Sequence, residues 1–278
     1  MSKGKVLVGL SGGVDSSVSA LLLKEQGYEV EALFMKNWDD DDGSPYCSAK
    51  EDFMDAAFIS DQLDIPLEQV SFSKEYRENV FSYFLQELEA GRTPNPDILC
   101  NREIKFGAFK NHAERLGAEF IATGHYAKIK SDNGALKLFK SKDKNKDQTY
   151  FLYAVEPKNF INTIFPLADI SKEEVRAIAQ ANGLINYKKR DSTGICFIGK
   201  RPFKEFLGSY IPSEPGNIID RKGTIVGEHD GLMFHTIGQR QGLNIGGIKN
   251  GSGEPWYCLL YTSPSPRDAT LSRMPSSA

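Results

Sequence analysis

Cysteine is scarce in this 278-residue chain, and its four cysteines are scattered at positions 47, 100, 196 and 258. They are too few for the disulfide framework that holds small secreted domains together. None belongs to a C-x-x-C pair, which argues against a structural zinc module, an iron–sulfur site and a thioredoxin-type motif. We therefore expect no structural metal and no iron–sulfur cluster.

Long apolar runs and a strong net charge are also missing. No run approaches the roughly 20 residues that a membrane-spanning helix needs, so no membrane partner is expected. The start, "MSKGKVLVGL", enters a strand pattern at once, without the apolar segment and cleavage site of a secretory signal. We therefore expect a cytoplasmic protein. The net charge of −3 neither favours nor excludes nucleic acid binding.

The first half of the chain alternates strand-like and helix-like segments. "KVLVGL" and "VEALFM" are strand-like, and the helical patterns between such runs end at Gly27, Gly91 and Gly117. This rhythm predicts an α/β fold, with a mostly parallel, doubly wound sheet over residues 1–200 and ligands at the carboxyl ends of its strands.

Two local patterns and a change in residue pattern after residue 200 complete the expected organisation. Residues 128–139 predict a hairpin around Asn133-Gly134, and Ser171 with Glu174 predicts a capping box. Beyond residue 200, short strands and frequent glycine predict a small β-rich domain over residues 201–257.

The strongest signal is "VLVGLSGGVDSSVSALLL", which predicts a strand, a loop of small residues and a helix that begins near Val14. The loop N–H groups and the positive helix end converge on one point, where an anion is expected. No lysine follows the second glycine, so this is not a P-loop of the G-x-x-x-x-G-K type. Asp15 would repel a bare phosphate, which favours a Mg²⁺ ion between them. The alternative is an ordinary strand-to-helix turn with a serine N-cap.

The loop resembles the pyrophosphate loop of the ATP pyrophosphatases, which have an adenine nucleotide α-hydrolase-like fold. Other motifs narrow the resemblance to the tRNA-specific 2-thiouridylase family: "FMKNWDDDDG", "AGRTPNPDILCNREIKF", "ATGHYAKI", "KDQTYFLY", "DSTGICFIG" and "HTIGQRQGLNIGG". They follow in the expected order from Lys5 to about Tyr257. The resemblance implies a tRNA-uridine 2-sulfurtransferase, which adenylates the C2 oxygen of the wobble uridine and then transfers sulfur from a protein persulfide.

Two cysteines lie in polar motifs. Cys100 comes close to the expected start of a helix, whose dipole favours the nucleophilic thiolate. It could instead be an ordinary buried cysteine, although Asn95, Asp97 and Asn101 fit an open site better than a core. Cys196 lies in a turn-rich segment, or else fills a gap behind "ICFI".

The resemblance gives these cysteines roles in sulfur transfer. Cys196 is implied to accept sulfur as a persulfide, and Cys100 to act as partner nucleophile and then form a transient disulfide with it. Direct attack by the persulfide and release of hydrosulfide by Cys100 both stay open. Asp97 is implied as general acid/base, but an aspartate here could equally be the N-cap of the helix that holds Cys100. The implied sulfur donor is a persulfide carrier, either a cysteine desulfurase or a relay protein.

The resemblance also implies ATP, Mg²⁺ and tRNA as ligands. The implied nucleotide-binding residues are Gly9, Leu10, Ser11, Gly12, Gly13, Val14, Asp15, Ser16, Met35 and Gly124, with Asp15 as the Mg²⁺ ligand. The implied tRNA contacts are Asn95, Pro96, Asp97, Lys146, Asp147 and Gln148. The run Lys188, Lys189 and Arg190 could neutralise phosphates or could be a solvated face.

Other functions explain less of the sequence. An argininosuccinate or NAD synthetase would account for the loop but not for the two cysteine motifs. A cytidine thiolase would need cluster-binding C-x-x-C pairs, and a thiol oxidoreductase would have no use for the loop. A non-catalytic tRNA-binding relative is expected to have lost Asp15 or one of the two cysteines, and all three are present.

The family pattern stops after "GEPWY", where the family continues through a β-barrel domain. Residues 258–278, "CLLYTSPSPRDATLSRMPSSA", lack two-residue alternation and are rich in serine and proline. We expect a disordered segment there, one that is foreign to the family and joined to a truncated enzyme. A natural, short and flexible C-terminus is the alternative.

Overall fold

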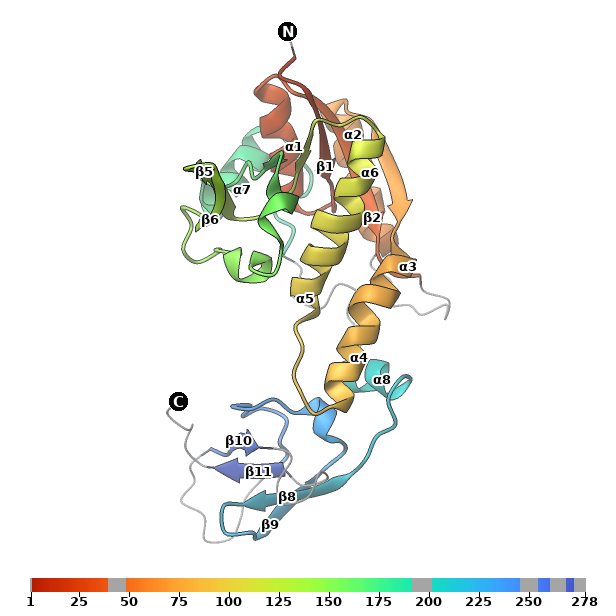
Figure 1. Cartoon of the computed structure of the whole chain (residues 1–278), viewed down its shortest axis with the longest axis vertical. Coiled ribbons are helices and arrows are strands. Elements are labelled where there is room, and N and C mark those ends of the chain that lie inside the picture. Colours follow the sequence, from red (N-terminus) through yellow and green to blue (C-terminus); the bar gives the residue numbers. More distant parts are fainter. Residues whose placement is uncertain (1, 40–48, 192–201, 246–254, 261–268, 273–278) are drawn as a thin grey trace. The chain divides into compact units, whose positions relative to one another are not determined.

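The computed structural model describes residues 2–39, 49–191, 202–245, 255–260 and 269–272. The chain divides into two compact units, residues 1–81 with 95–200 and residues 82–94 with 201–278 (Figure 1). Within the described ranges, no helix is long and apolar enough to cross a membrane.

A parallel sheet forms the centre of the first unit. Its strands are β3, β2, β1, β4 and β7 in spatial order, and every neighbouring pair is parallel. Their bounds are β1 Lys5–Gly9, β2 Glu29–Lys36, β3 Leu67–Ser71, β4 Phe120–Ala122 and β7 Thr163–Ile164. The parallel α/β fold expected from the sequence is confirmed.

Helices cover this sheet because its central strands are apolar on both faces. In β1, Val6 and Val8 pack in one core with Val18, Ile59 and Val175 from three helices. The alternate residue Leu7 points to the opposite face and is only 1% exposed, so that face is covered too. The helices of the unit are α1 Val14–Glu25, α2 Ala49–Leu63, α3 Ser73–Tyr76, η1 Arg77–Phe81, α5 Pro96–Leu99, η2 Cys100–Ala108, α6 Phe109–Arg115, η3 Thr149–Leu152, η4 Pro157–Phe160 and α7 Lys172–Ala181.

Both local predictions in this unit are confirmed. Strands β5 (Ala127–Asp132) and β6 (Ala135–Lys140) form a hairpin, and Asn133 and Gly134 both have positive φ, as a two-residue type I′ turn requires. Helix α7 begins with the expected capping box, in which the Ser171 and Glu174 side chains each accept from the other's backbone N–H.

The second unit is built around a four-stranded sheet in the order β10, β11, β8 and β9. Its elements are α4 Ser82–Glu89, α8 Phe203–Gly208, β8 Gly216–Asp220, β9 Ile225–His229, η5 Leu232–Phe234, β10 Tyr257–Leu260 and β11 Ala269–Ser272. The sequence pattern did not place residues 82–94 here. The reason is a contact between segments far apart in the sequence. The ring centroids of Phe84 in α4 and Phe203 in α8 lie 6.5 Å apart, so α4 belongs with the elements after residue 200.

The last described residues differ from the expectation of a segment without strands. β11 lies within residues 258–278, and it pairs antiparallel with β10 and parallel with β8. Strand pairing requires only backbone groups and a neighbouring edge, so weak side-chain alternation does not prevent it. The foreign origin of this segment stays a prediction.

Gly12 and Gly27 allow a matched test of the loop after β1. Both have positive φ, but a Cβ at Gly12 would overlap the carbonyl oxygen of Asp52, whereas a Cβ at Gly27 would meet nothing within 4 Å. We expect Gly27→Ala to lower the free energy of unfolding by about 1 kcal/mol, through backbone strain alone. Gly12→Ala should cost at least about 2 kcal/mol, because the overlap adds to the strain.

Urea unfolding of the two variants, followed by the fluorescence of Trp38, measures this difference. Equal costs at the two positions would show that Asp52 yields to the added methyl group.

Candidate functional site

The carboxyl ends of β1, β2 and β4 meet at one edge of the central sheet. The chain leaves β1 towards β2 on one side, while β4 flanks β1 on the other side, so the direction of winding reverses here. Gly9 is the last residue of β1, and Met35 is the residue before the last in β2. Gly124 follows β4. A Cβ on Gly9 would lie 3.0 Å from the Cε of Met35. The structure thus brings three of the predicted nucleotide-binding positions to one edge of the sheet.

The loop from Gly9 to Ser16 is held by its own hydroxyl groups. The N–H of Ser11 donates to Ser16 Oγ (3.1 Å), and Ser16 Oγ donates to the carbonyl oxygen of Gly13 (3.0 Å). Helix α1 starts at Val14, and its N-cap Gly13 has no side chain to cap the first turn. The N–H groups of that turn are therefore left for an anion. This geometry fits a pyrophosphate group.

A second layer supports the loop from behind, and the sequence analysis missed part of it. The buried Asn186 donates from Nδ2 to the Gly12 carbonyl oxygen (3.1 Å) and to Ser17 Oγ (2.8 Å). Lys189 forms ion pairs with Asp52 (2.7 Å) and Asp55 (2.5 Å) on α2. Lys189 is thus part of the support and not of a phosphate-binding run, whereas Lys188 and Arg190 are exposed.

The carboxylate of Asp15 is the centre of a charged network. It accepts hydrogen bonds from Lys172 Nζ (2.7 Å to each oxygen) and from the Tyr126 hydroxyl (2.8 Å). Burial, and then the nearby charge of Asp15, raises the pKa of Tyr126. Tyr126 therefore stays protonated and donates. Lys172 is 8% exposed and was not singled out by the sequence analysis. It balances part of the negative charge of Asp15, because it is shared with Asp191.

The network continues to Asp191. Lys172 Nζ lies 2.6 Å from Asp191 Oδ1, and Lys146 Nζ lies 2.6 Å from Asp191 Oδ2. Burial raises the pKa of Asp191, but the hydrogen bonds from Lys146 and Lys172 lower it by more. Three charged pairs therefore connect the loop, the start of α7 and Lys146, one of the residues predicted to contact tRNA.

Gly124 is required by close packing on the loop. A Cβ at this position would lie 2.8 Å from both the Asp15 carbonyl carbon and the Ser16 nitrogen. Any side chain would therefore push the loop away from β4. The structure explains why a glycine stands here, and its contact with adenosine remains a proposal.

Cys100 lies inside a continuous helical segment. The segment starts with α5 at Pro96, continues as the π-helix η2 from Cys100 and ends with α6. Cys100 is therefore one turn past the helix start, and its side chain is 1% exposed. The N-cap is Asn95, whose Oδ1 accepts from the N–H of Asp97 (3.1 Å). The alternative in which Asp97 is the N-cap is thus wrong, because Asp97 lies in the first turn and Asn95 has the extended backbone of a cap.

Burial raises the pKa of the Asp97 carboxyl, and the charge of Lys105 opposes this only in part. A carboxyl whose pKa is raised towards neutrality can exchange a proton more readily at the working pH. The direction of this shift suits the general acid/base role proposed from the sequence.

The segment after Lys146 lies between the loop and the Cys100 helix. Tyr126 and Gln148 form two hydrogen bonds, both 3.0 Å long. The backbone N–H of Tyr126 donates to Gln148 Oε1, and the backbone N–H of Gln148 donates to the carbonyl oxygen of Tyr126. Asn101 Nδ2 donates to the Phe151 oxygen (3.0 Å). Within the described residues, Asn101 Oδ1 and Asp147 Oδ1 are buried and accept no hydrogen bond. The predicted tRNA-contacting residues on both segments thus belong to one region.

Some sequence predictions fall outside the described residues. These are the predictions that concern Cys196, including its disulfide with Cys100. Among the described residues, no group of three or more His, Cys, Asp or Glu side chains could hold a metal ion.

Lys172 can be tested against a matched surface lysine. Lys172→Met should lower the free energy of unfolding by about 2–3 kcal/mol, because it removes the lysine paired with Asp15 and one of the cations paired with Asp191 in a partly buried site. Lys142→Met removes an exposed pair with Glu174 at 3.1 Å and should cost no more than about 0.5 kcal/mol. Urea unfolding of both variants measures the difference, and similar costs would mean that Lys172 is as well solvated as Lys142.

Asp97→Asn should raise the free energy of unfolding at neutral pH. The folded pKa of Asp97 is raised above the unfolded value, so the ionised carboxylate lowers stability at every pH above the folded pKa. This cost disappears below the unfolded pKa of about 3.9, where both states are protonated. The unfolding free energies of the two proteins should therefore converge as the pH falls. A difference that widens on acidification contradicts the shift.

Comparison with known proteins gives matches over most of the chain. Residues 4–200 match the family model described as "tRNA methyl transferase HUP domain", and residues 204–262 match "tRNA methyl transferase PRC-barrel domain". The tRNA-specific 2-thiouridylase MnmA of Nitrosomonas eutropha is 62% identical over 257 residues, which cover 92% of this chain and 71% of that protein. Its counterpart in Legionella pneumophila is 60% identical over the same shares. Among solved structures, an NMN synthetase from Francisella tularensis has a TM-score of 0.45 and 19% identity, covering 74% of this chain and 73% of that one.

Proposed function

Because the chain belongs to the tRNA-specific 2-thiouridylase family, we propose that it catalyses the ATP-dependent 2-thiolation of the wobble uridine of tRNA. One observation in the structure carries the proposal. The pyrophosphate loop and the Cys100 helix are joined by one short segment, through Tyr126 to Asp15 on one side and through Asn101 on the other. A substrate atom that reacts first with ATP and then with a sulfur atom needs both groups close to it.

The loop side of the site binds ATP in this proposal. The N–H groups of the first turn of α1 bind the pyrophosphate portion, and Met35 and Gly124 contact the adenosine at the strand ends. The carboxylate of Asp15 would supply the kind of oxygen ligand that Mg²⁺ prefers. This ion is usually bound by one or two carboxylates together with substrate phosphates. Lys172 then orients Asp15 and supplies a positive charge near the phosphates. Adenylation of the C2 oxygen turns it into a good leaving group.

The sulfur side uses the two cysteines and Asp97. Cys196 carries a persulfide, and its outer sulfur becomes bonded to uridine C2 as AMP leaves. If Cys100 attacks the inner sulfur of the persulfide, the outer sulfur is released as hydrosulfide and a Cys100–Cys196 disulfide forms, which a reductant must later reopen. If the persulfide attacks directly, Cys100 attacks after the C–S bond has formed, and the same disulfide results. Asp97 moves the proton at uridine N3.

The proposed function also requires an RNA substrate and a sulfur donor. Asn95, Pro96 and Asp97 contact the target base, while Lys146, Asp147 and Gln148 contact the RNA near it. The sulfur comes from a persulfide carrier, either a cysteine desulfurase or a relay protein. A cytoplasmic location is part of this proposal, because tRNA and these donors would be met there.

Substitution of the cysteines tests the sulfur chemistry. Cys100→Ser and Cys196→Ser should each reduce 2-thiouridine formation to background, because a hydroxyl can neither carry a persulfide nor form the disulfide. ATP binding should be unchanged in both variants, because the loop is held by contacts that involve neither cysteine. Mass spectrometry of the nucleosides of the reacted tRNA gives the first result, and calorimetry gives the second.

Cys258→Ala is the matched control, since Cys258 is a buried cysteine in the second unit. It should keep its thiolation activity. Full thiolation by either serine variant would refute the role of that cysteine. A wild-type protein that forms no 2-thiouridine from ATP, tRNA and a persulfide donor would refute the function as a whole.

A further inference from the structure

Two tyrosines, one in η3 and one directly after it, form an exposed aromatic surface. Tyr150 is 63% exposed and Tyr153 is 67% exposed. Their ring centroids lie 6.0 Å apart, with 46° between the ring planes. Side chains three residues apart in a 3₁₀-helix eclipse each other, so both rings lie on one face. Single exposed aromatic residues are common on protein surfaces, but a pair in ring contact presents one continuous surface.

The position of this pair separates it from other exposed aromatics of the chain. The Phe151 carbonyl between the two tyrosines accepts from Asn101, the neighbour of Cys100. On the other side, Gln148 is hydrogen-bonded to Tyr126, which in turn donates to Asp15. A polynucleotide whose target base reacts between Cys100 and the loop would therefore pass close to the segment that carries the tyrosines.

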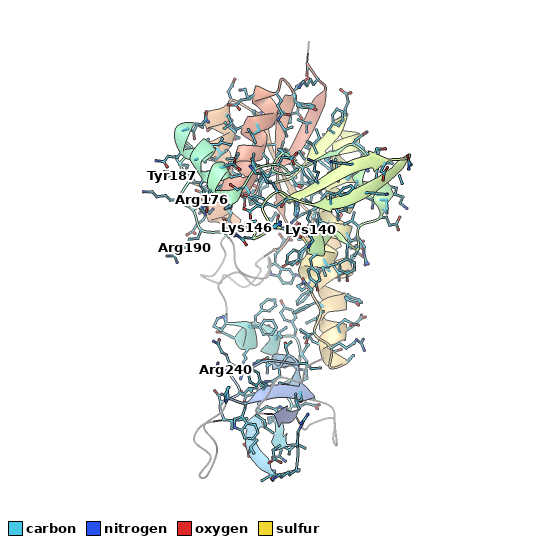
Figure 2. All side chains as sticks on the ribbon, turned by 90° about the vertical axis from the view of Figure 1, so that its left-hand side faces the viewer. Lys140, Lys146, Arg176, Tyr187, Arg190 and Arg240 are labelled. Carbon is cyan, nitrogen blue, oxygen red and sulfur yellow. The ribbon has the colours of Figure 1, made fainter. Side chains whose placement is uncertain are left out.

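The charge around the pair suits a polyanion. The segment "KLFKSKDKNKDQTYFLY" has five lysines and two aspartates in the thirteen residues that precede Tyr150. Lys140 and Lys144 are exposed, and no ion pair among the described residues engages them. Figure 2 labels Lys140 and Lys146, both on the first unit. Phosphate contacts are therefore available next to aromatic rings, as in proteins that bind single-stranded nucleic acid.

We propose that Tyr150 and Tyr153 form a stacking platform for unpaired bases of the RNA substrate that flank the target uridine. The proposal rests on the function proposed above and adds the residues that recognise the neighbouring bases. Proteins recognise RNA loops mainly by stacking splayed bases on aromatic rings. The rings give affinity without reading sequence, because every base has a face that can stack.

The test measures binding of a fluorescein-labelled RNA hairpin with an anticodon loop to the full chain, without ATP. Tyr150→Ala and Tyr153→Ala should each weaken binding about tenfold, because stacking contributes about 1–3 kcal/mol per base. Tyr150→Phe and Tyr153→Phe should stay within about twofold of wild type, because the ring is kept. Phe58→Ala, which removes an exposed aromatic ring on α2, is the matched control and should bind like wild type.

The salt dependence separates stacking from charge. The alanine variants should keep the wild-type slope of log affinity against log salt, whereas Lys144→Gln should reduce the slope by about one. Unchanged ATP affinity in the alanine variants shows that η3 has kept its place beside Tyr126.

Two outcomes overturn the platform and leave the function standing. In the first, the alanine variants bind the hairpin like wild type while wild type forms 2-thiouridine. In the second, they keep RNA affinity and lose turnover with a protein-borne persulfide but not with sulfide, which assigns the tyrosines to a protein partner. Wild type that does not bind the hairpin overturns the platform as well. If wild type forms no 2-thiouridine but the alanine variants still bind the hairpin more weakly than wild type, the proposed function is refuted and the stacking platform stands.

Discussion

The ion pair between Asp15 and Lys172 is the contact on which the arrangement of the site depends. Lys172 is almost fully buried, and a lysine is tolerated there only when its charge is paired. Because Asp15 lies in the first turn of α1 and Lys172 is the first residue of α7, the pair fixes two helix starts against each other. Tyr126 and Asp191 attach to the same two groups. Any change in this pair is therefore expected to reach the loop, the segment after β4 and Lys146 together.

The order of the strands decides where this network can form. β1 lies between β2 and β4, so the loops that follow these three strands open to one edge of the sheet. Close approach of Gly124 to the Asp15 and Ser16 backbone is possible only without a side chain. The same edge receives Gln148, which pairs with Tyr126 and carries η3 towards the Cys100 helix. The glycine-rich loop and the Cys100 helix thus lie in a single unit and are connected through the segment around Gln148.

The Cys100 helix holds the cysteine that we propose as a nucleophile in a buried position. Its thiol is buried and lies one turn inside the helix, while Asp97 nearby has a pKa raised by burial. Both features cost stability or access in the resting state, and both are common where a site has to work on a bound substrate. The π-helix that starts at Cys100 is consistent with this, since π-helical turns often occur at functional sites.

The sequence by itself determined the parallel α/β fold, the hairpin at Asn133-Gly134, the capping box of α7 and the glycine-rich loop before α1. Each of these is set by neighbouring residues, through side-chain period, turn geometry or local hydrogen bonds. Only the tertiary structure assigned Lys172 to Asp15, Lys189 to α2, Asn186 to the loop and Asn95 as the helix cap. It also joined residues 82–94 to the second unit. The physical reason is that most of these partners lie far apart in the chain, and their pairing depends on burial and distance that a residue pattern does not contain.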